Sequence, residues 1–133
     1  SDPRVVEAIQ AQAATLTYAG PGMATPIRAE LGEALAAVTP RGLDKFFFTL
    51  GGSDANENAV KLARAVTGRQ KILTRYRAYH GATYGAVTLT GDHRRWASEP
   101  GLPGVVRMFD PYKYRSPLYR PGDSDTELKI TIF

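Results

Sequence analysis

Apolar side chains recur at helical spacing in two stretches near the start of the chain. The first stretch follows Asp2-Pro3, an N-capping residue with proline in the first turn, and predicts a helix from about residue 3 to 15. The second stretch follows Thr25-Pro26, the same kind of start, and predicts a helix from about residue 26 to 38. A turn rich in glycine separates the two helices.

The pattern then changes to apolar runs that alternate with helical segments. Lys45 to Leu50 contains three consecutive phenylalanines, which is typical of a central parallel strand covered on both faces. A helix begins near Ser53 and is expected to end at Gly68, and Lys71 to Arg75 reads as the next strand. Strand, helix and strand in this order predict a right-handed βαβ unit.

Shorter elements follow the second strand. Ala82 to Leu89 and His93 to Ser98 are expected to be short helices, and Val105 to Phe109 a third strand. The segment from Asp110 to Asp125 has no clear period, and Lys129 to Phe133 is a short β-prone run. The sequence therefore predicts an α/β fold in which two helices precede a parallel-sheet core.

Gly51-Gly52-Ser53 is the first candidate for chemistry. Glycines allow a close approach of the backbone to a ligand, and a helix start offers free N–H groups and a positive dipole end, so the turn suits a phosphate. It is neither a Walker A loop nor a dinucleotide fingerprint. A tight turn with a helix cap explains the same residues. Asp54 and Glu57 are expected to cap N–H groups, and Glu57 can pair with Lys61.

Tyr79-His80-Gly81 is the second candidate, because it follows the second strand as the glycine turn follows the first. Loops after neighbouring parallel strands emerge at the same edge of a sheet, where ligands bind. An aromatic ring at this edge can stack on a planar ligand. The alternative is an ordinary loop tyrosine beside a histidine bonded to the backbone.

Composition narrows the classes of function. The chain has 17 basic and 13 acidic residues and a net charge of +4, but the charges are scattered, so we expect no nucleic-acid binding. It contains no cysteine, and its two histidines, His80 and His93, have no third ligand at metal spacing, so we expect no metal site. Without a long apolar run or a signal pattern, we expect a cytoplasmic protein that does not bind membranes.

The two loops and the helix between them resemble the class III (omega) aminotransferases, which are pyridoxal-phosphate enzymes of fold type I. The resemblance lies in Phe47 to Glu57, Ala59 to Arg64 and Tyr79 to Thr83, and it extends over roughly residues 5 to 122. Gly51 and Asp54 depart mildly from the family, where serine and glutamate are common.

The resemblance implies roles for four residues. Gly52 and Ser53 would bind the cofactor phosphate, Tyr79 would stack on the pyridine ring, and His80 would shape the pocket. It also implies transfer of an amino group from an amine or amino acid to a 2-oxo acid, and a homodimer. The related decarboxylase, mutase and racemase reactions remain open, since the same cofactor supports them.

The family's Schiff-base lysine has no counterpart among Lys45, Lys61, Lys71, Lys113 and Lys129. We therefore expect residues 1–133 to be part of a cofactor-binding large domain, with no catalytic residue of their own and no activity alone. One alternative is a non-catalytic remnant or partner subunit of an aminotransferase. Another is a phosphate- or nucleic-acid-binding module built on the same glycine turn.

Overall fold

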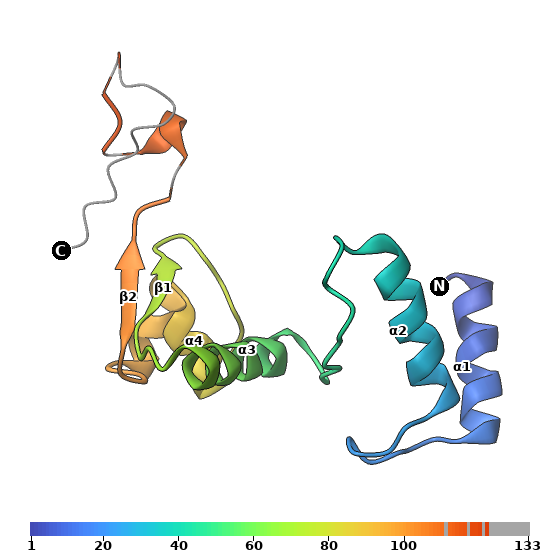
Figure 1. Cartoon of the computed structure of the whole chain (residues 1–133). Coiled ribbons are helices and arrows are strands. Elements are labelled where there is room, and N and C mark those ends of the chain that lie inside the picture. The colour runs from blue at the N-terminus through green and yellow to red at the C-terminus, as the bar shows by residue number, and fades with distance from the viewer. Residues whose placement is uncertain (111, 117, 121, 123–133) are drawn as a thin grey trace. The chain divides into compact units, whose positions relative to one another are not determined.

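The computed structural model describes residues 1–110, 112–116, 118–120 and 122 (Figure 1). The chain divides into two compact units, Ser1–Phe47 and a second that begins at Phe48. Within the described residues, the helices are too short or too polar to cross a membrane.

The first unit contains two helices, α1 (Pro3–Thr15) and α2 (Pro26–Val38), as the sequence predicts. The Asp2 carboxylate caps α1 by accepting a hydrogen bond of 2.9 Å from the backbone N–H of Arg4. The connection between the helices is held by Arg28, whose guanidinium donates to the carbonyl oxygens of Ala19, Gly20 and Met23. These bonds give a glycine-containing loop a fixed path.

The second unit carries the remaining elements. In chain order they are α3 (Gly52–Thr67), β1 (Ile72–Arg75), α4 (Tyr84–Leu89), the 3₁₀ helix η1 (His93–Ser98), β2 (Val105–Met108) and the 3₁₀ helix η2 (Lys113–Arg115). The predicted short helices and the strands at 71–75 and 105–109 are confirmed. So is the end of α3 at Gly68, which has a left-handed conformation. The turn at η2 is not predicted, and Lys129 to Phe133 lies outside the described residues.

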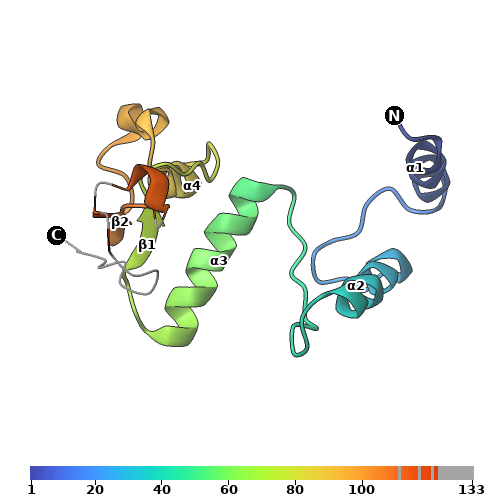
Figure 2. The same ribbon diagram turned by 90° about the horizontal axis from the view of Figure 1, so that it is seen from above.

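β1 and β2 form a parallel pair whose register runs from Ile72 opposite Val105 to Arg75 opposite Met108. The crossover between them contains α4 and η1, so β1, α4 and β2 form a βαβ unit. Figures 1 and 2 show α4 beside β1, where the Thr74 hydroxyl donates 2.6 Å to the carbonyl oxygen of Leu89. The buried side chains of the second unit gather here: Thr74, Ala78, Ala86, Val87, Thr88, Leu89 and Thr90.

The predicted strand from Lys45 to Leu50 is wrong, and so is the βαβ unit built on it. These residues have no regular structure, and Phe47 is 67% and Phe48 41% exposed. A parallel strand needs a neighbour for its N–H and C=O groups, and in the part of the chain that the structure describes β1 pairs with β2 alone. Three phenylalanines supply apolar surface but no partner.

Candidate functional site

The first turn of α3 presents free hydrogen-bond donors. Gly51 precedes the helix in an extended conformation and provides no side-chain cap, while its carbonyl oxygen accepts from Ala55 N at 3.0 Å. Among the described residues, no acceptor is found for the N–H groups of Gly52, Ser53 and Asp54. The start of a 16-residue helix also carries the positive end of its dipole. This turn can therefore receive an anion.

The second predicted loop meets this turn through Ser53. The backbone N–H of Ala82 donates 3.3 Å to the Ser53 hydroxyl oxygen, which leaves the hydroxyl proton available to another acceptor. Gly81 of the second loop lies at this contact, with φ +128°. A Cβ on Gly81 would overlap the Ser53 hydroxyl and come within 3.1 Å of the Ala86 side chain. The loop can approach the helix this closely only with glycine at that position.

His80 is fixed through both of its backbone groups. Its carbonyl oxygen accepts a 2.7 Å hydrogen bond from the Asn56 side-chain amide, and its N–H donates 3.1 Å to the Thr90 hydroxyl. The residue also borders a small hollow between α3 and β1. These two hydrogen bonds involve the backbone of His80 and not its imidazole. The role of the imidazole in shaping a cofactor pocket remains a prediction.

Glu57 binds the far end of the same loop. Its carboxylate accepts from the Thr83 hydroxyl and from the N–H groups of Gly85 at 3.1 Å and Ala86 at 3.4 Å, so it caps α4. The Thr83 hydrogen bond is the largest cause of a lowered pKa for Glu57. Lys61, the predicted pairing partner, adds only the weakest of these effects. Asp54 accepts a 3.3 Å hydrogen bond from the backbone N–H of Leu50, which precedes α3, so it caps no N–H group of the helix's own first turn.

Asn56 is a residue that the sequence reasoning missed. Ser53, Asn56 and Glu57 are spaced three and four residues apart, so they share one face of α3, and all three bind the segment from His80 to Ala86. Of the apolar side chains of α3, Val60 is half-buried, while Leu62 is 56% and Val66 82% exposed. The polar spacing was the signal for this contact.

Tyr79 stands at the same loop with half of its surface exposed. The guanidinium of Arg94 covers one face of the phenol ring, with the ζ carbon 3.9 Å from the ring centroid. A second planar group can therefore stack on the ring only from the opposite face. In the described part of the chain, no three acidic or histidine side chains gather to hold a metal ion.

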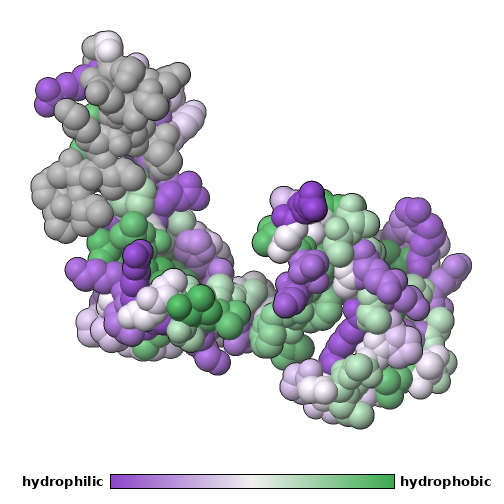
Figure 3. Space-filling model, viewed as in Figure 1, coloured by the Kyte–Doolittle hydropathy of each residue, from purple (hydrophilic) through white to green (hydrophobic). Residues whose placement is uncertain are grey.

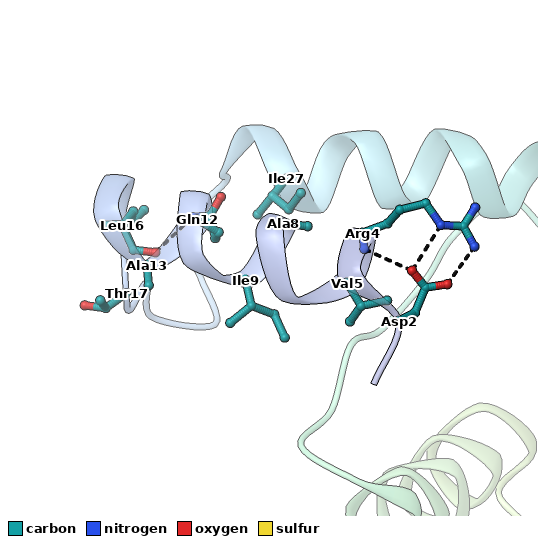
Figure 4. Close-up of a pocket in the computed structure, with 10 residues that line it drawn as sticks. All are labelled: Asp2, Arg4, Val5, Ala8, Ile9, Gln12, Ala13, Leu16, Thr17 and Ile27. Atoms are coloured by element: carbon teal, nitrogen blue, oxygen red, sulfur yellow. Dashed lines mark hydrogen bonds and ion pairs between the residues drawn. The ribbon is translucent and has the colours of Figure 1, made fainter.

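Another hollow lies in the first unit and includes none of the predicted site residues (Figure 4). It is an open groove lined mainly by the aliphatic side chains of Val5, Ala8, Ile9, Ala13, Leu16 and Ile27. The Asp2–Arg4 ion pair adjoins it. Figure 3 shows apolar surface on both units. The polar side chains of its lining are Asp2, Arg4, Gln12 and Thr17, and the Asp2 carboxylate is already paired with Arg4.

Comparison with known proteins identifies the family. The model of the family "Aminotransferase class-III" matches residues 1–128. This chain belongs to the class III aminotransferases. Members of this family use pyridoxal phosphate. The resemblance in the two loops is thereby confirmed at the level of the family, and so is the expectation of a partial α/β fold of this type.

Relatives of this class III chain differ in their reactions. An isoleucine 2-epimerase of Lentilactobacillus buchneri is 37% identical over 98% of the chain. A probable aminotransferase of Mycobacterium tuberculosis is 42% identical over 86% of it. The taurine:2-oxoglutarate aminotransferase of Bifidobacterium kashiwanohense, solved with PLP and glutamate, is 41% identical over 92% of the chain, with a TM-score of 0.81.

The class III chain spans less than a third of these proteins. It covers 29% of the epimerase, 26% of the Mycobacterium protein and 28% of the solved chain. Its own residues nevertheless fit the family's cofactor. The uncapped start of α3 suits a phosphate, the close approach at Gly81 brings the second loop to it, and Tyr79 is half exposed with Arg94 over one face of its ring. The roles of Gly52, Ser53, Tyr79 and His80 remain predictions.

Proposed function

We propose that this chain supplies the phosphate- and ring-binding loops of a pyridoxal-phosphate-dependent aminotransferase, and that residues 1–133 are part of its cofactor-binding large domain. The observation that carries the proposal is the joining of two loops. The start of α3, with its free N–H groups, is bonded to the Tyr79-His80-Gly81 loop through Ser53 and Asn56. Both halves of a phosphate-and-ring site thus lie within one unit.

Each residue has a distinct role in this proposal. The N–H groups of Gly52 and Ser53, with the Ser53 hydroxyl, hold the phosphate. Tyr79 stacks on the pyridine ring, and His80 shapes the pocket beside it. When bound, the cofactor supplies a sink for the electrons released at the substrate's α carbon. The four residues named above bind and orient the cofactor. A lysine that is not among them supplies the proton transfers.

For the whole protein we propose transfer of an amino group from an amine or amino acid to a 2-oxo acid, in a cytoplasmic homodimer. The names of the Mycobacterium and Bifidobacterium relatives support the reaction. The bound glutamate of the Bifidobacterium structure supports an amino-acid substrate. The dimer is an extension from the family resemblance, and the compartment is an extension from the composition of the chain.

Epimerisation of an amino acid is a second candidate, favoured by the 37% identity to isoleucine 2-epimerase. An epimerase removes and returns the α proton and consumes no 2-oxo acid. Incubating the whole protein with L-isoleucine alone separates the two reactions. We expect no change of configuration without a 2-oxo acid and formation of a new amino acid with one. Inversion at the α carbon without any acceptor would support the epimerase.

Substitution at Gly52 tests the phosphate site with little disturbance of the fold. Gly52→Pro removes one N–H group but keeps a residue that is favoured in the first turn of a helix. Gly52→Ala keeps the N–H group, and its Cβ meets no atom within 4 Å. We expect calorimetry to show weaker binding of pyridoxamine 5′-phosphate to Gly52→Pro, by about tenfold, and unchanged binding to Gly52→Ala. Equal affinities in the two variants would overturn the phosphate assignment.

A further inference from the structure

Tyr79 is held from one side by a residue of another segment. The ζ carbon of Arg94 lies over the phenol ring, 3.9 Å from its centroid, which is within the range of a cation–π contact. The guanidinium is planar and can stack flat on an aromatic face, which an ammonium group cannot do. One face of the ring is therefore covered and half of the residue's surface is exposed, so a planar ligand can stack only on the face opposite Arg94.

Arg94 is itself fixed by Asp92. Its Nε donates 3.0 Å to each carboxylate oxygen of Asp92, and Nη2 donates to the same group. The Arg94 backbone N–H adds a 3.0 Å bond to Oδ1, which makes Asp92 the N-cap of η1. These hydrogen bonds from Arg94 lower the pKa of Asp92 to about 2, so the pair is charged at neutral pH.

The neighbouring arginine, Arg95, has a different partner. Arg95 pairs with Glu99 at 3.0 Å, one helical turn further along. Two adjacent arginines thus have different partners, and only Arg94 contacts the ring. The Asp92–Arg94 arrangement is consequently specific to Tyr79 and not a general feature of a basic segment.

We propose that Arg94, held by Asp92, is a positioning residue for Tyr79: it covers one face of the phenol ring, fixes the ring plane and leaves the opposite face for the pyridine ring of pyridoxal phosphate. The inference rests on the proposed function, since it assigns the free face to that cofactor. A ring that is already fixed loses less side-chain freedom when a planar ligand stacks on it. Arg94 therefore strengthens ring binding without touching the phosphate.

A double-mutant cycle tests this coupling. Binding of pyridoxamine 5′-phosphate and of inorganic phosphate is measured by calorimetry for the 133-residue chain and for Arg94→Ala, Tyr79→Ala and the double variant. We expect Arg94→Ala to weaken pyridoxamine 5′-phosphate about threefold when Tyr79 is present and not at all when it is absent. Inorganic phosphate should bind equally to the wild type and Arg94→Ala. Arg69→Ala is the matched charge control, because Arg69 lies just beyond the C-terminal end of α3.

Three outcomes would count against the proposal in different ways. An equal loss for inorganic phosphate would mean that Arg94 contacts the phosphate itself and would overturn the positioning role. An equal loss with and without Tyr79 would overturn it as well. No binding of pyridoxamine 5′-phosphate to the wild type, at any concentration reached, would overturn the proposed function and the cofactor's place on Tyr79 together.

A measurement on the ligand-free protein separates these failures. A guanidinium that lies over a phenol ring has its side-chain proton resonances displaced by the ring current. We expect displaced resonances for Arg94 in the wild type, lost in Tyr79→Leu and in Asp92→Asn, and retained in Arg69→Ala. If the wild type lacks the displacement, or if Tyr79→Leu retains it, Arg94 does not position the ring, whatever the cofactor does.

Discussion

The side-chain amide of Asn56 donates a 2.7 Å hydrogen bond to the carbonyl oxygen of His80, across 24 residues of sequence. This bond joins the first turns of α3, where the N–H groups are free, to the loop that carries the tyrosine. The conformation of the loop therefore depends on the helix, and loss of the Asn56 amide should make the backbone around His80 more mobile.

Asn56→Ala is expected to lower the free energy of unfolding by about 1 kcal/mol, because the partly buried His80 carbonyl loses its donor. Faster amide exchange around His80 should accompany the change. Asn58→Ala is the matched control, since the side-chain amide of Asn58 donates, within the described part of the chain, to Asp54 of the same helix. Chemical denaturation and hydrogen exchange check both variants. If Asn56→Ala and Asn58→Ala behave alike, the bond does not hold the loop.

Gly81→Ala is expected to destabilise the chain by about 2 kcal/mol, because φ is +128° and the new Cβ would overlap the Ser53 hydroxyl. Gly32→Ala provides a control of opposite sign. Gly32 lies in α2, and a Cβ added there would meet no atom within 4 Å, so alanine should stabilise the helix by up to about 1 kcal/mol. Thermal denaturation of both variants decides the matter, and a neutral Gly81→Ala would refute the close approach of the two loops.

The lowered pKa of Glu57 predicts that the stability of the chain depends on pH. Its folded pKa is lowered below the ordinary value of 4.5, first by the Thr83 hydroxyl and then by the N–H groups of Ala86 and Gly85. A lowered carboxyl pKa stabilises the fold above the unfolded pKa, and this contribution is lost as the pH falls through the folded pKa. The free energy of unfolding of the wild type should therefore fall towards that of Glu57→Gln in acid.

Urea denaturation between about pH 6 and pH 3 measures this difference. Glu30→Gln, on the exposed surface of α2, serves as the control for loss of one carboxylate. A gap between wild type and Glu57→Gln that stays constant over this range would show that the carboxylate does not cap α4.

The 133-residue chain alone should not sustain transamination. Lys61 lies two turns beyond Ser53 on α3, next to Glu57, and Lys113 stacks near Tyr119 at 5.3 Å, so neither stands at Tyr79. Turnover of an amine and a 2-oxo acid is measured with added pyridoxal phosphate, against the slow background of the free cofactor. Sustained turnover above background that disappears in Tyr79→Ala would contradict the prediction that the 133-residue chain is inactive alone.

Local patterns predicted most of the helices because their signals are local. Asp2-Pro3 and Thr25-Pro26 mark the starts of α1 and α2, and Gly68 marks the end of α3, as each does in the structure. Proline and glycine act through their own backbone preferences, so distant residues are not needed to interpret them. The two candidate loops were also selected from local features, their glycines and aromatic ring, and their role in a site stays a prediction.

The predictions that failed depend on partners far away in the sequence. Three phenylalanines from Phe46 indicate a buried strand only if another strand lies beside them, and none is found among the described residues. The expected pairing of Glu57 with Lys61 is present but weak, because Lys61 lowers the pKa of Glu57 less than the N–H groups of α4 do. Asn56 and Arg94 were missed for the same reason, since their partners, His80 and Tyr79, are 24 and 15 residues away.

The most direct test of the proposed cofactor site is an amide NMR titration of the ¹⁵N-labelled chain with pyridoxamine 5′-phosphate and, separately, with inorganic phosphate. Both ligands should shift the amide resonances of Gly52 and Ser53, and only the first should also shift those of Tyr79 and His80. Shifts confined to the α1 groove around Ile9, or no shift at Gly52 and Ser53 with either ligand, would contradict the site.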